Sequence, residues 1–282
     1  MKRILVTGAN SYIGTYVEKY LSCWPESYQI DTVDMIGDTW KEKSFRDYDV
    51  VFHVAGIAHR KEKKENEALY YQVNRDLAIE VAKKSKQQGV KQLIFLSTMS
   101  VYGMNTGIIT RDTKLNPKNN YAKSKLQAEE HIKNLENDAF KVCILRPPMV
   151  YGKGCKGNFP TLVRIVEKLP VFPKVKNQRS MLYIEHLAAF VKLLIDRECR
   201  GMYFPQNKEY GQTMEIARVT AEVREKRIYF SMIFGVGVLV LKPFMKIIQK
   251  SFGTLLYKDM EDFDYIYCKK SFVDSLYESI ED

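Results

Sequence analysis

The sequence predicts a doubly wound α/β fold with a smaller second lobe, and three observations lead to this prediction. Short β-rich runs alternate with helical patterns up to about residue 148, and this order implies parallel strands joined by crossover helices. The first apolar run, at residues 4–6, leads directly into the glycine-containing stretch TGANSYIG at 7–14. After Pro148 the glycines and prolines crowd together and aromatic residues become frequent, which indicates the second lobe.

The predicted elements follow from hydrophobic periodicity. Apolar runs predict strands at residues 3–8, 28–33, 48–56, 91–98 and 141–148. Helical spacing predicts helices at 12–21, 67–88, 119–136 and 184–197. About 15 residues separate the second strand from the third, so that crossover should contain no full helix. We assign residues 1–148 and about 180–200 to a dinucleotide-binding domain, and about 149–179 and 201–282 to a substrate-binding lobe.

Composition and charge limit the class of protein. The chain has 282 residues and 45% hydrophobic content, enough for a substantial core, and its formal charge of +10 favours anionic partners. The lysines are scattered along predicted helices, which favours solvated helix faces over a nucleic-acid patch. Five dispersed cysteines indicate reduced thiols in a cytosolic protein, with neither a disulfide framework nor a metal site. The N-terminal MKRILV turns polar too soon for a signal peptide.

The longest apolar run is IYFSMIFGVGVLVL at residues 228–241. Its 14 residues are too few for an ordinary membrane span of about 20 residues. We expect a buried helix of the second lobe. The alternative is an interfacial membrane contact or an oligomer surface, because Lys242, Lys246 and Lys250 follow the run at helical spacing.

The stretch TGANSYIG has the context of a phosphate-binding turn. A strand that leads through glycines into a helix places backbone N–H groups and a positive helix end where a pyrophosphate would lie. Gly8 would form the turn and Gly14 would let the helix pack on the strand, while Ser11 replaces a middle glycine with a small side chain. The alternative is a structural turn that binds nothing. The candidate cofactor-binding positions in this stretch are Gly8, Asn10, Ser11, Tyr12, Ile13 and Gly14.

Asp34 lies 20 residues after Gly14, at the end of the second predicted strand. A carboxylate there can accept hydrogen bonds from the adenosine ribose hydroxyls and would repel a 2′-phosphate. We therefore predict NAD as the cofactor. NADP is the alternative, because Lys41 and Lys43 lie close in sequence; an ordinary turn aspartate is the other interpretation of Asp34.

The stretch YAKSK places Tyr121 and Lys125 one helical turn apart, on one face of a predicted helix. An ammonium near a phenol lowers the tyrosine pKa, which suits proton exchange with a carbinol or a ketone. The pattern by itself is common by chance. Thr98 strengthens it, because this residue closes the preceding strand at the sheet edge where such folds bind ligands.

Together these stretches resemble the extended short-chain dehydrogenase/reductase family, in its nucleotide-sugar epimerase, dehydratase and reductase branch. The motifs are TGANSYIG, HVAG at 53–56, Asn74 in YQVNRD, STMSVYG at 97–103, YAKSK and LRPPMVYGKG at 145–154. The resemblance covers nearly the whole chain and implies a Rossmann fold. It also implies that Thr98, Tyr121 and Lys125 form the catalytic triad, in which Thr98 would hydrogen-bond the substrate oxygen and Tyr121 would pass its proton. The cofactor site would include Ala55, Gly56, Asn74, Tyr121, Lys125 and Pro148, and Lys125 would hold the nicotinamide ribose.

The same resemblance implies a UDP-sugar substrate. Met99 and Ser100 would lie beside it, and Asn158 in GNFP and Arg179 in QRSMLYIEHLA would contact its diphosphate. Asn158 could instead only end a loop, and Arg179 could pair with a neighbouring acid. The family habit also implies a homodimer with a two-helix interface.

The residues after Thr98 help to separate the reactions of this branch. A 4,6-dehydratase would resemble STDEVYG there, with an acid and a base beside the threonine, whereas this chain has Met99 and Ser100. Its LRPPMVYGKG and VFHVAGIAH segments most resemble reductases that act on UDP-4-keto-6-deoxy-N-acetylglucosamine for capsule or O-antigen. We therefore predict a 4-reductase. A 4-epimerase that retains its NAD is the first alternative, and an NAD-binding sensor or scaffold without turnover is the second.

Overall fold

The computed structural model describes residues 1–58, 62–241 and 244–281. It contains two compact units. The first comprises Met1–Gly103, Leu115–Pro147 and Leu187–Pro205, and the second comprises Met104–Lys114, Pro148–His186 and Gln206–Asp282. Residues 104–114, assigned from the sequence to the first domain, thus belong to the second unit.

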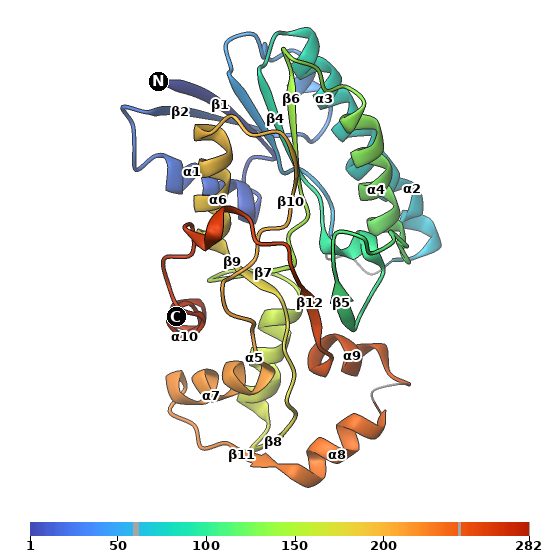
Figure 1. Cartoon of the computed structure of the whole chain (residues 1–282), viewed down its shortest axis with the longest axis vertical. Helices are drawn as coiled ribbons and strands as arrows, with labels where there is room; N and C mark the ends of the chain where they lie inside the picture. The colour runs from blue at the N-terminus through green and yellow to red at the C-terminus, as the bar shows by residue number, and fades with distance from the viewer. Residues whose placement is uncertain (59–61, 242–243, 282) are drawn as a thin grey trace. The chain divides into compact units, whose positions relative to one another are not determined.

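The first unit is built on one parallel sheet of six strands in the order β10-β6-β4-β3-β1-β2 (Figure 1). The strands are β1 (Lys2–Thr7), β2 (Tyr28–Val33), β3 (Val50–His53), β4 (Gln92–Leu96), β6 (Lys141–Leu145) and β10 (Gly201–Tyr203). Every residue of β3 and β4 is buried, as expected where helices cover both faces of a parallel sheet. The predicted fold class is confirmed.

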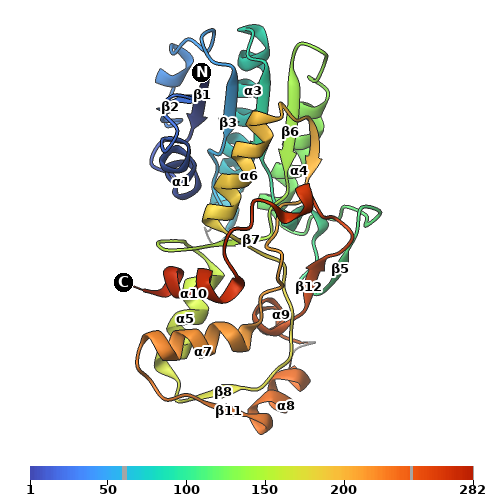
Figure 2. The same ribbon diagram turned by 60° about the vertical axis from the view of Figure 1, so that its left-hand side comes forward.

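Figures 1 and 2 show α3 and α4 on one face of this sheet and α1 and α6 on the other. The helices are α1 (Tyr12–Leu21), α2 (Glu67–Tyr71), α3 (Leu77–Gln87), α4 (Asn120–Lys133) and α6 (Ile184–Asp196). The helix predicted at 67–88 is therefore α2 and α3, joined by a π-helical segment at Gln72–Asp76. The short crossover contains a single 3₁₀ turn, Thr39–Lys41, as its length predicts. Further 3₁₀ turns lie at Lys64–Asn66 and Met99–Tyr102.

In the part of the second unit that the structure describes, there are three small two-stranded sheets. They pair β7 (Met149–Tyr151) with β9 (Met181–Tyr183), β8 (Val171–Pro173) with β11 (Tyr229–Ser231), and β5 (Gly107–Ile109) with β12 (Leu255–Tyr257). Its helices are α5 (Asn158–Lys168), α7 (Thr213–Val223), α8 (Met232–Leu241), α9 (Lys246–Phe252) and α10 (Phe272–Ile280), and a 3₁₀ turn lies at Phe263–Tyr265. Helix α7 packs against both α5 and α10.

The apolar run at 228–241 differs from its prediction. It forms β11 and α8, and most of the α8 side chains are exposed, so the expectation of a buried helix is wrong. Within α8 only Gly235 is buried, and it packs so closely on the neighbouring backbone that a Cβ there would lie 2.4 Å from the carbonyl oxygen of Lys174. Lys242 and the side chain of Lys246, which follow the run, lie outside the described part of the structure. Within that part, no helix is both long and apolar enough to cross a bilayer.

Candidate active site

The turn after β1 requires glycine. Gly8 has a φ of 101°, and a Cβ at this position would lie 3.0 Å from the backbone of Ala55, which follows β3. The amides of Gly8 and Ala9 donate to the carbonyl oxygen of Val33 at 2.9 and 3.0 Å, so the end of β2 holds the turn. An L-residue at position 8 would therefore be strained and would meet the neighbouring backbone.

Ser11 is the N-cap of α1. Its backbone is extended, and its Oγ accepts a hydrogen bond from the Gly14 amide at 3.2 Å. A Cβ at Gly14 would lie 2.6 Å from this oxygen, so Gly14 allows the cap to form close to the helix. Asn10 adopts a left-handed φ of 62°, which asparagine tolerates better than most residues.

The turn at residues 7–14 fits a pyrophosphate. The first turn of α1 carries no acidic side chain, and it contains Tyr12, Ile13 and Gly14. The first amides of a helix and its positive dipole end attract an anion. The two glycines keep side chains away from the turn, so the residues present suit the dinucleotide predicted from the sequence.

Asp34 directly follows β2 and is exposed, and its carboxylate accepts from the Ile36 amide at 3.0 Å. The two lysines that made NADP an alternative have other contacts. Lys41 pairs with Asp38 at 2.8 Å and with Glu80 at 3.6 Å. Lys43 lies over the ring of Tyr48, 5.5 Å from its centroid. These contacts support the preference for NAD.

Asn74 fixes the loop after β3. It is fully buried in the π-helical segment, where its Oδ1 accepts from the Ile57 amide at 2.9 Å and its Nδ2 donates to the Ile57 carbonyl at 3.0 Å. A Cβ at Gly56 would lie 2.9 Å from Asn74 Oδ1 and 3.3 Å from Lys125 Nζ. The loop, the π-helical segment and the lysine of the YAKSK motif therefore meet at Gly56.

The start of α4 is held from two sides. The Asn119 side chain caps the helix by accepting from the Ala122 amide at 2.8 Å. The Glu62 carboxylate accepts from the amides of Asn120 and Tyr121 at 3.2 and 3.1 Å. These contacts stabilise the helical turn that carries Tyr121 at the carboxyl edge of the sheet.

Thr98 and Tyr121 lie close enough for the Thr98 hydroxyl to influence the phenol. Burial raises the pKa of Tyr121, and the hydroxyl of Thr98 opposes this increase. Thr98 Oγ1 also accepts from the Ser100 amide at 3.1 Å and lies 3.2 Å from Ser100 Oγ, while Met99 is buried. The expected lowering of the tyrosine pKa is therefore wrong in direction, because desolvation outweighs the effects that favour phenolate.

Lys125 is almost fully buried, with 4% of its surface exposed. Its Nζ donates to the Leu96 carbonyl at 2.9 Å and lies 4.7 Å from the centroid of the Phe95 ring. Burial lowers the pKa of Lys125 to about 8, which the charge of Glu129 partly opposes. Lys125 can therefore exchange a proton near neutral pH, whereas an ordinary lysine cannot.

A buried ion pair lies beyond this lysine on α4, and sequence reasoning did not identify it. The Arg146 guanidinium donates to the Glu129 carboxylate at 2.6, 3.1 and 3.2 Å, and Arg146 also donates to the Tyr102 hydroxyl at 3.1 Å. Ser97 donates to the same carboxylate. The pair thus joins the end of β4, the turn after it, α4 and the end of β6.

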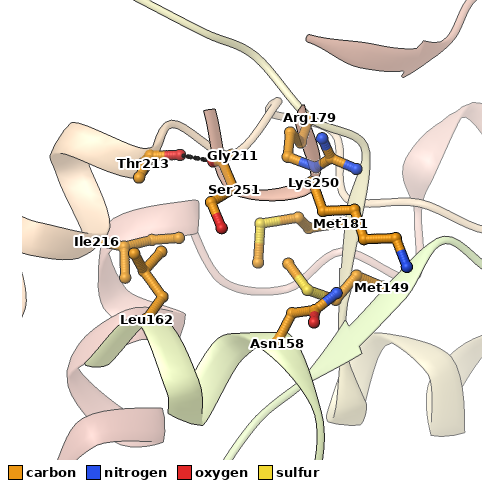
Figure 3. A pocket seen from close by; sticks show the side chains of 10 residues that line it. All are labelled: Met149, Asn158, Leu162, Arg179, Met181, Gly211, Thr213, Ile216, Lys250 and Ser251. Carbon is orange, nitrogen blue, oxygen red and sulfur yellow. Dashed lines mark hydrogen bonds between the residues drawn. The ribbon is translucent and has the colours of Figure 1, made fainter. Parts of the chain in front are cut away.

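In the second unit, Asn158 and Arg179 line one small pocket (Figure 3). Asn158 is the first residue of α5, and Pro148 immediately precedes β7. Arg179 Nη1 donates to the carbonyl of Gly253 at 2.9 Å, and burial lowers the pKa of Arg179 to about 10. Among the residues that the structure describes, no carboxylate pairs with Arg179.

The same pocket contains Lys250, whose role the sequence did not suggest. Figure 3 shows its side chain among the residues that line this pocket. The remaining lining residues are Met149, Leu162, Met181, Gly211, Thr213, Ile216 and Ser251. Two cations and an amide in one partly apolar pocket can bind an anionic ligand with an attached ring.

Comparison with known proteins identifies the family. The model of the NAD dependent epimerase/dehydratase family matches residues 4–203. The chain belongs to this family. Members of the epimerase/dehydratase family are NAD-dependent enzymes, so the cofactor predicted from Gly8, Gly14 and Asp34 is the family's cofactor.

Relatives within the epimerase/dehydratase family catalyse more than one reaction. A UDP-glucose 4-epimerase of Vibrio cholerae is 32% identical over 252 residues, which cover 80% of this chain and 76% of the relative. A UDP-2-acetamido-2,6-beta-L-arabino-hexul-4-ose reductase of Pseudomonas aeruginosa is 25% identical over 239 residues, covering 80% of this chain and 58% of the relative.

A solved structure shows the same fold. The UDP-glucuronic acid 4-epimerase of Bacillus cereus in complex with NAD superimposes with a TM-score of 0.74 at 20% identity, covering 99% of this chain and 97% of that one.

Proposed function

We propose that the chain is an NAD(H)-dependent reductase that acts at C4 of a UDP-linked 4-keto-6-deoxy-N-acetylhexosamine, for a cell-surface polysaccharide. The observation that carries this proposal is the Thr98–Tyr121 pair beside Lys125. A tyrosine side chain is a phenol at neutral pH, and burial, which raises the pKa of Tyr121, favours this form, so Tyr121 can donate a proton. Reduction of a ketone needs such a donor, whereas oxidation of an alcohol needs a base.

Thr98, Tyr121 and Lys125 have different roles in the proposed reduction. NADH, when bound, would supply the hydride for C4 of the substrate. Thr98 and Tyr121 hold the ketone oxygen between two hydroxyl groups, and the Tyr121 hydroxyl proton moves to that oxygen as it becomes an alcohol. Lys125, with a pKa of about 8, can return a proton to the tyrosinate and hold the nicotinamide ribose. Met99 and Ser100 supply no carboxyl group, which disfavours elimination of water.

The second unit would bind the sugar nucleotide through its diphosphate, and the first would bind NAD(H). Arg179 is half-buried, and a diphosphate would supply a negative charge to its guanidinium. Arg179 can donate in a fork to phosphate oxygens, with Asn158 and Lys250 in the same pocket. This assignment agrees with the net charge of +10.

A 4-epimerase is the second candidate, favoured by the 32% identity with the Vibrio cholerae protein. It would use the same Thr98, Tyr121 and Lys125. It would differ in retaining its cofactor, because the hydride removed from C4 must return to the opposite face.

The test uses purified protein from which bound nucleotide has been released. The protein receives NADH or NADPH with UDP-4-keto-6-deoxy-N-acetylglucosamine, and loss of reduced-nicotinamide absorbance is followed. Oxidation stoichiometric with a new deoxysugar nucleotide supports the reductase. Interconversion of UDP-N-acetylglucosamine and UDP-N-acetylgalactosamine without added cofactor, in the absence of net oxidation, would assign the chain to the epimerases.

A Tyr121→Phe variant separates both enzymes from a protein that only binds NAD. We expect it to bind NADH normally and to lose turnover by a factor of about 10² or more, since it lacks the transferred proton. Tyr229→Phe, which changes an exposed phenol of the second unit, is the matched control. Full biological activity of Tyr121→Phe would favour the sensor or scaffold.

A further inference from the structure

Helix α8 presents an unusual surface. Its side chains Ile233, Phe234, Val236 and Val240 are 86%, 60%, 60% and 63% exposed, and Met232 is 69% exposed. Leu239 and Leu241 on the same helix are also exposed, as is Phe244 after it. Scattered apolar residues are normal on a surface, but a contiguous apolar patch of this kind marks an interaction site.

The geometry of this α8 surface limits what can cover it. At about 100° per residue, the exposed side chains from Met232 to Leu241 span about 220° of the helix circumference, more than half of it. The buried Gly235 packs on the backbone of Lys174, after β8, and Figure 2 shows α8 lying beside β8. A helix of 10 residues is about 15 Å long, half the thickness of a bilayer core, so it can lie in a membrane interface without spanning it.

The charges in the chain segment that contains α8 are of one sign. From Lys226 to Lys258 the sequence contains six basic residues and no acidic residue, although acids make up 34 of the 282 residues of the chain. Basic residues beside an exposed apolar helix are typical of segments that bind anionic lipid surfaces. Tyr229 and Phe244, 64% and 83% exposed, provide aromatic rings at both ends of the apolar stretch.

We propose that α8 docks in the headgroup region of an anionic membrane. A bilayer surrounds an apolar helix on all sides except the one that packs on protein, which matches the exposed arc. Anionic headgroups complement the acid-free segment. Lys250, in the following helix, lines the pocket that contains Arg179, so docking would hold this pocket close to the bilayer.

The test is sedimentation of the full chain with vesicles. One set contains phosphatidylglycerol and phosphatidylcholine in equal parts, and the other contains phosphatidylcholine alone. We expect binding to the anionic set that weakens with salt. The triple variant Ile233→Gln, Phe234→Gln and Val240→Gln should bind at least about tenfold more weakly. Ile36→Gln, at an apolar position of the first unit that is 82% exposed, is the matched control and should bind like the parent.

Two further measurements test whether the triple variant is folded and whether α8 enters the membrane interface. The triple variant should reduce the substrate in solution at the parental rate, which shows that it is folded. In a Phe234→Trp variant, tryptophan emission should shift to the blue on anionic vesicles. Equal vesicle binding by parent and triple variant would overturn the proposal. Concentration-dependent self-association that the triple variant abolishes, without vesicle binding by the parent, would assign the surface to a second copy of the chain.

Discussion

Replacing Lys125 with methionine should change how stability depends on pH. Burial lowers the pKa of Lys125 from 10.5 to about 8, and at about 1.4 kcal/mol per pKa unit the folded protein is destabilised by about 3 kcal/mol at pH 7. Methionine removes this cost, but it leaves the Leu96 carbonyl without its donor, which costs about 1–3 kcal/mol. At pH 7 the variant should therefore be as stable as the parent or more stable, although it has lost turnover.

The sign of the pH effect follows from proton binding. Between pH 8 and 10.5 the unfolded chain holds the lysine proton and the folded chain does not, so parental stability increases with pH in this window. The free energy of unfolding of the parent should increase by about 2 kcal/mol relative to Lys125→Met between pH 7 and 9.5.

Urea unfolding of parent and variant at both pH values measures this difference. Lys123→Met, at an exposed position of the same helix, is the control and should show no pH-dependent difference. The difference in the free energy of unfolding between the parent and Lys125→Met could instead stay constant between the two pH values, or change in the opposite direction. Either result would refute the reasoning that the folded site disfavours the ammonium.

Other substitutions test the rest of the site. Glu129→Gln should lower the free energy of unfolding in urea by about 3–5 kcal/mol, because Arg146 is left buried without its carboxylate. The double variant Glu129→Leu with Arg146→Met should recover most of this loss. A loss below about 1 kcal/mol in Glu129→Gln would contradict this reasoning. Gly8→Ala should cost about 1–3 kcal/mol and weaken NADH binding in a fluorescence titration, whereas parental binding would show that the turn tolerates a side chain. Ser11→Gly should cost only a few tenths of a kcal/mol and leave NADH affinity unchanged, and lost binding would give the hydroxyl a direct role at the phosphate. Arg179→Met should weaken UDP binding at least about tenfold by calorimetry, and unchanged affinity would place the diphosphate elsewhere.

Local signals accounted for the parts of the fold that local forces determine. Residues 12–21 and 28–33 were predicted from periodicity, and α1 and β2 have these bounds. The strand predicted at 48–56 stops at His53. Residues 54–56 of the predicted strand leave the sheet and lead into the loop at Ile57, which Asn74 binds. Ile57 and Asn74 lie 17 residues apart, and such a contact has no local sequence signature.

Tertiary structure also explains what the sequence could not indicate about the site. Tyr121 and Lys125 were found from their spacing, but the direction of the tyrosine pKa depends on burial, which spacing does not reveal. Lys250 lies 71 residues after Arg179, and only the fold of the second unit brings both into one pocket. The apolar run at 228–241 suggested a protein interior, because composition does not distinguish burial in protein from an exposed apolar surface.

The contacts of Asn74 make the Ile57 amide a reporter of local opening. Asn74 accepts from this amide and also donates to Ser124 in α4, at 3.4 Å. If α4 separates from the π-helical segment, the support for the loop is lost and the Ile57 amide can exchange its hydrogen with water. Hydrogen exchange at this one position would therefore follow the opening of the helix that carries Tyr121 and Lys125.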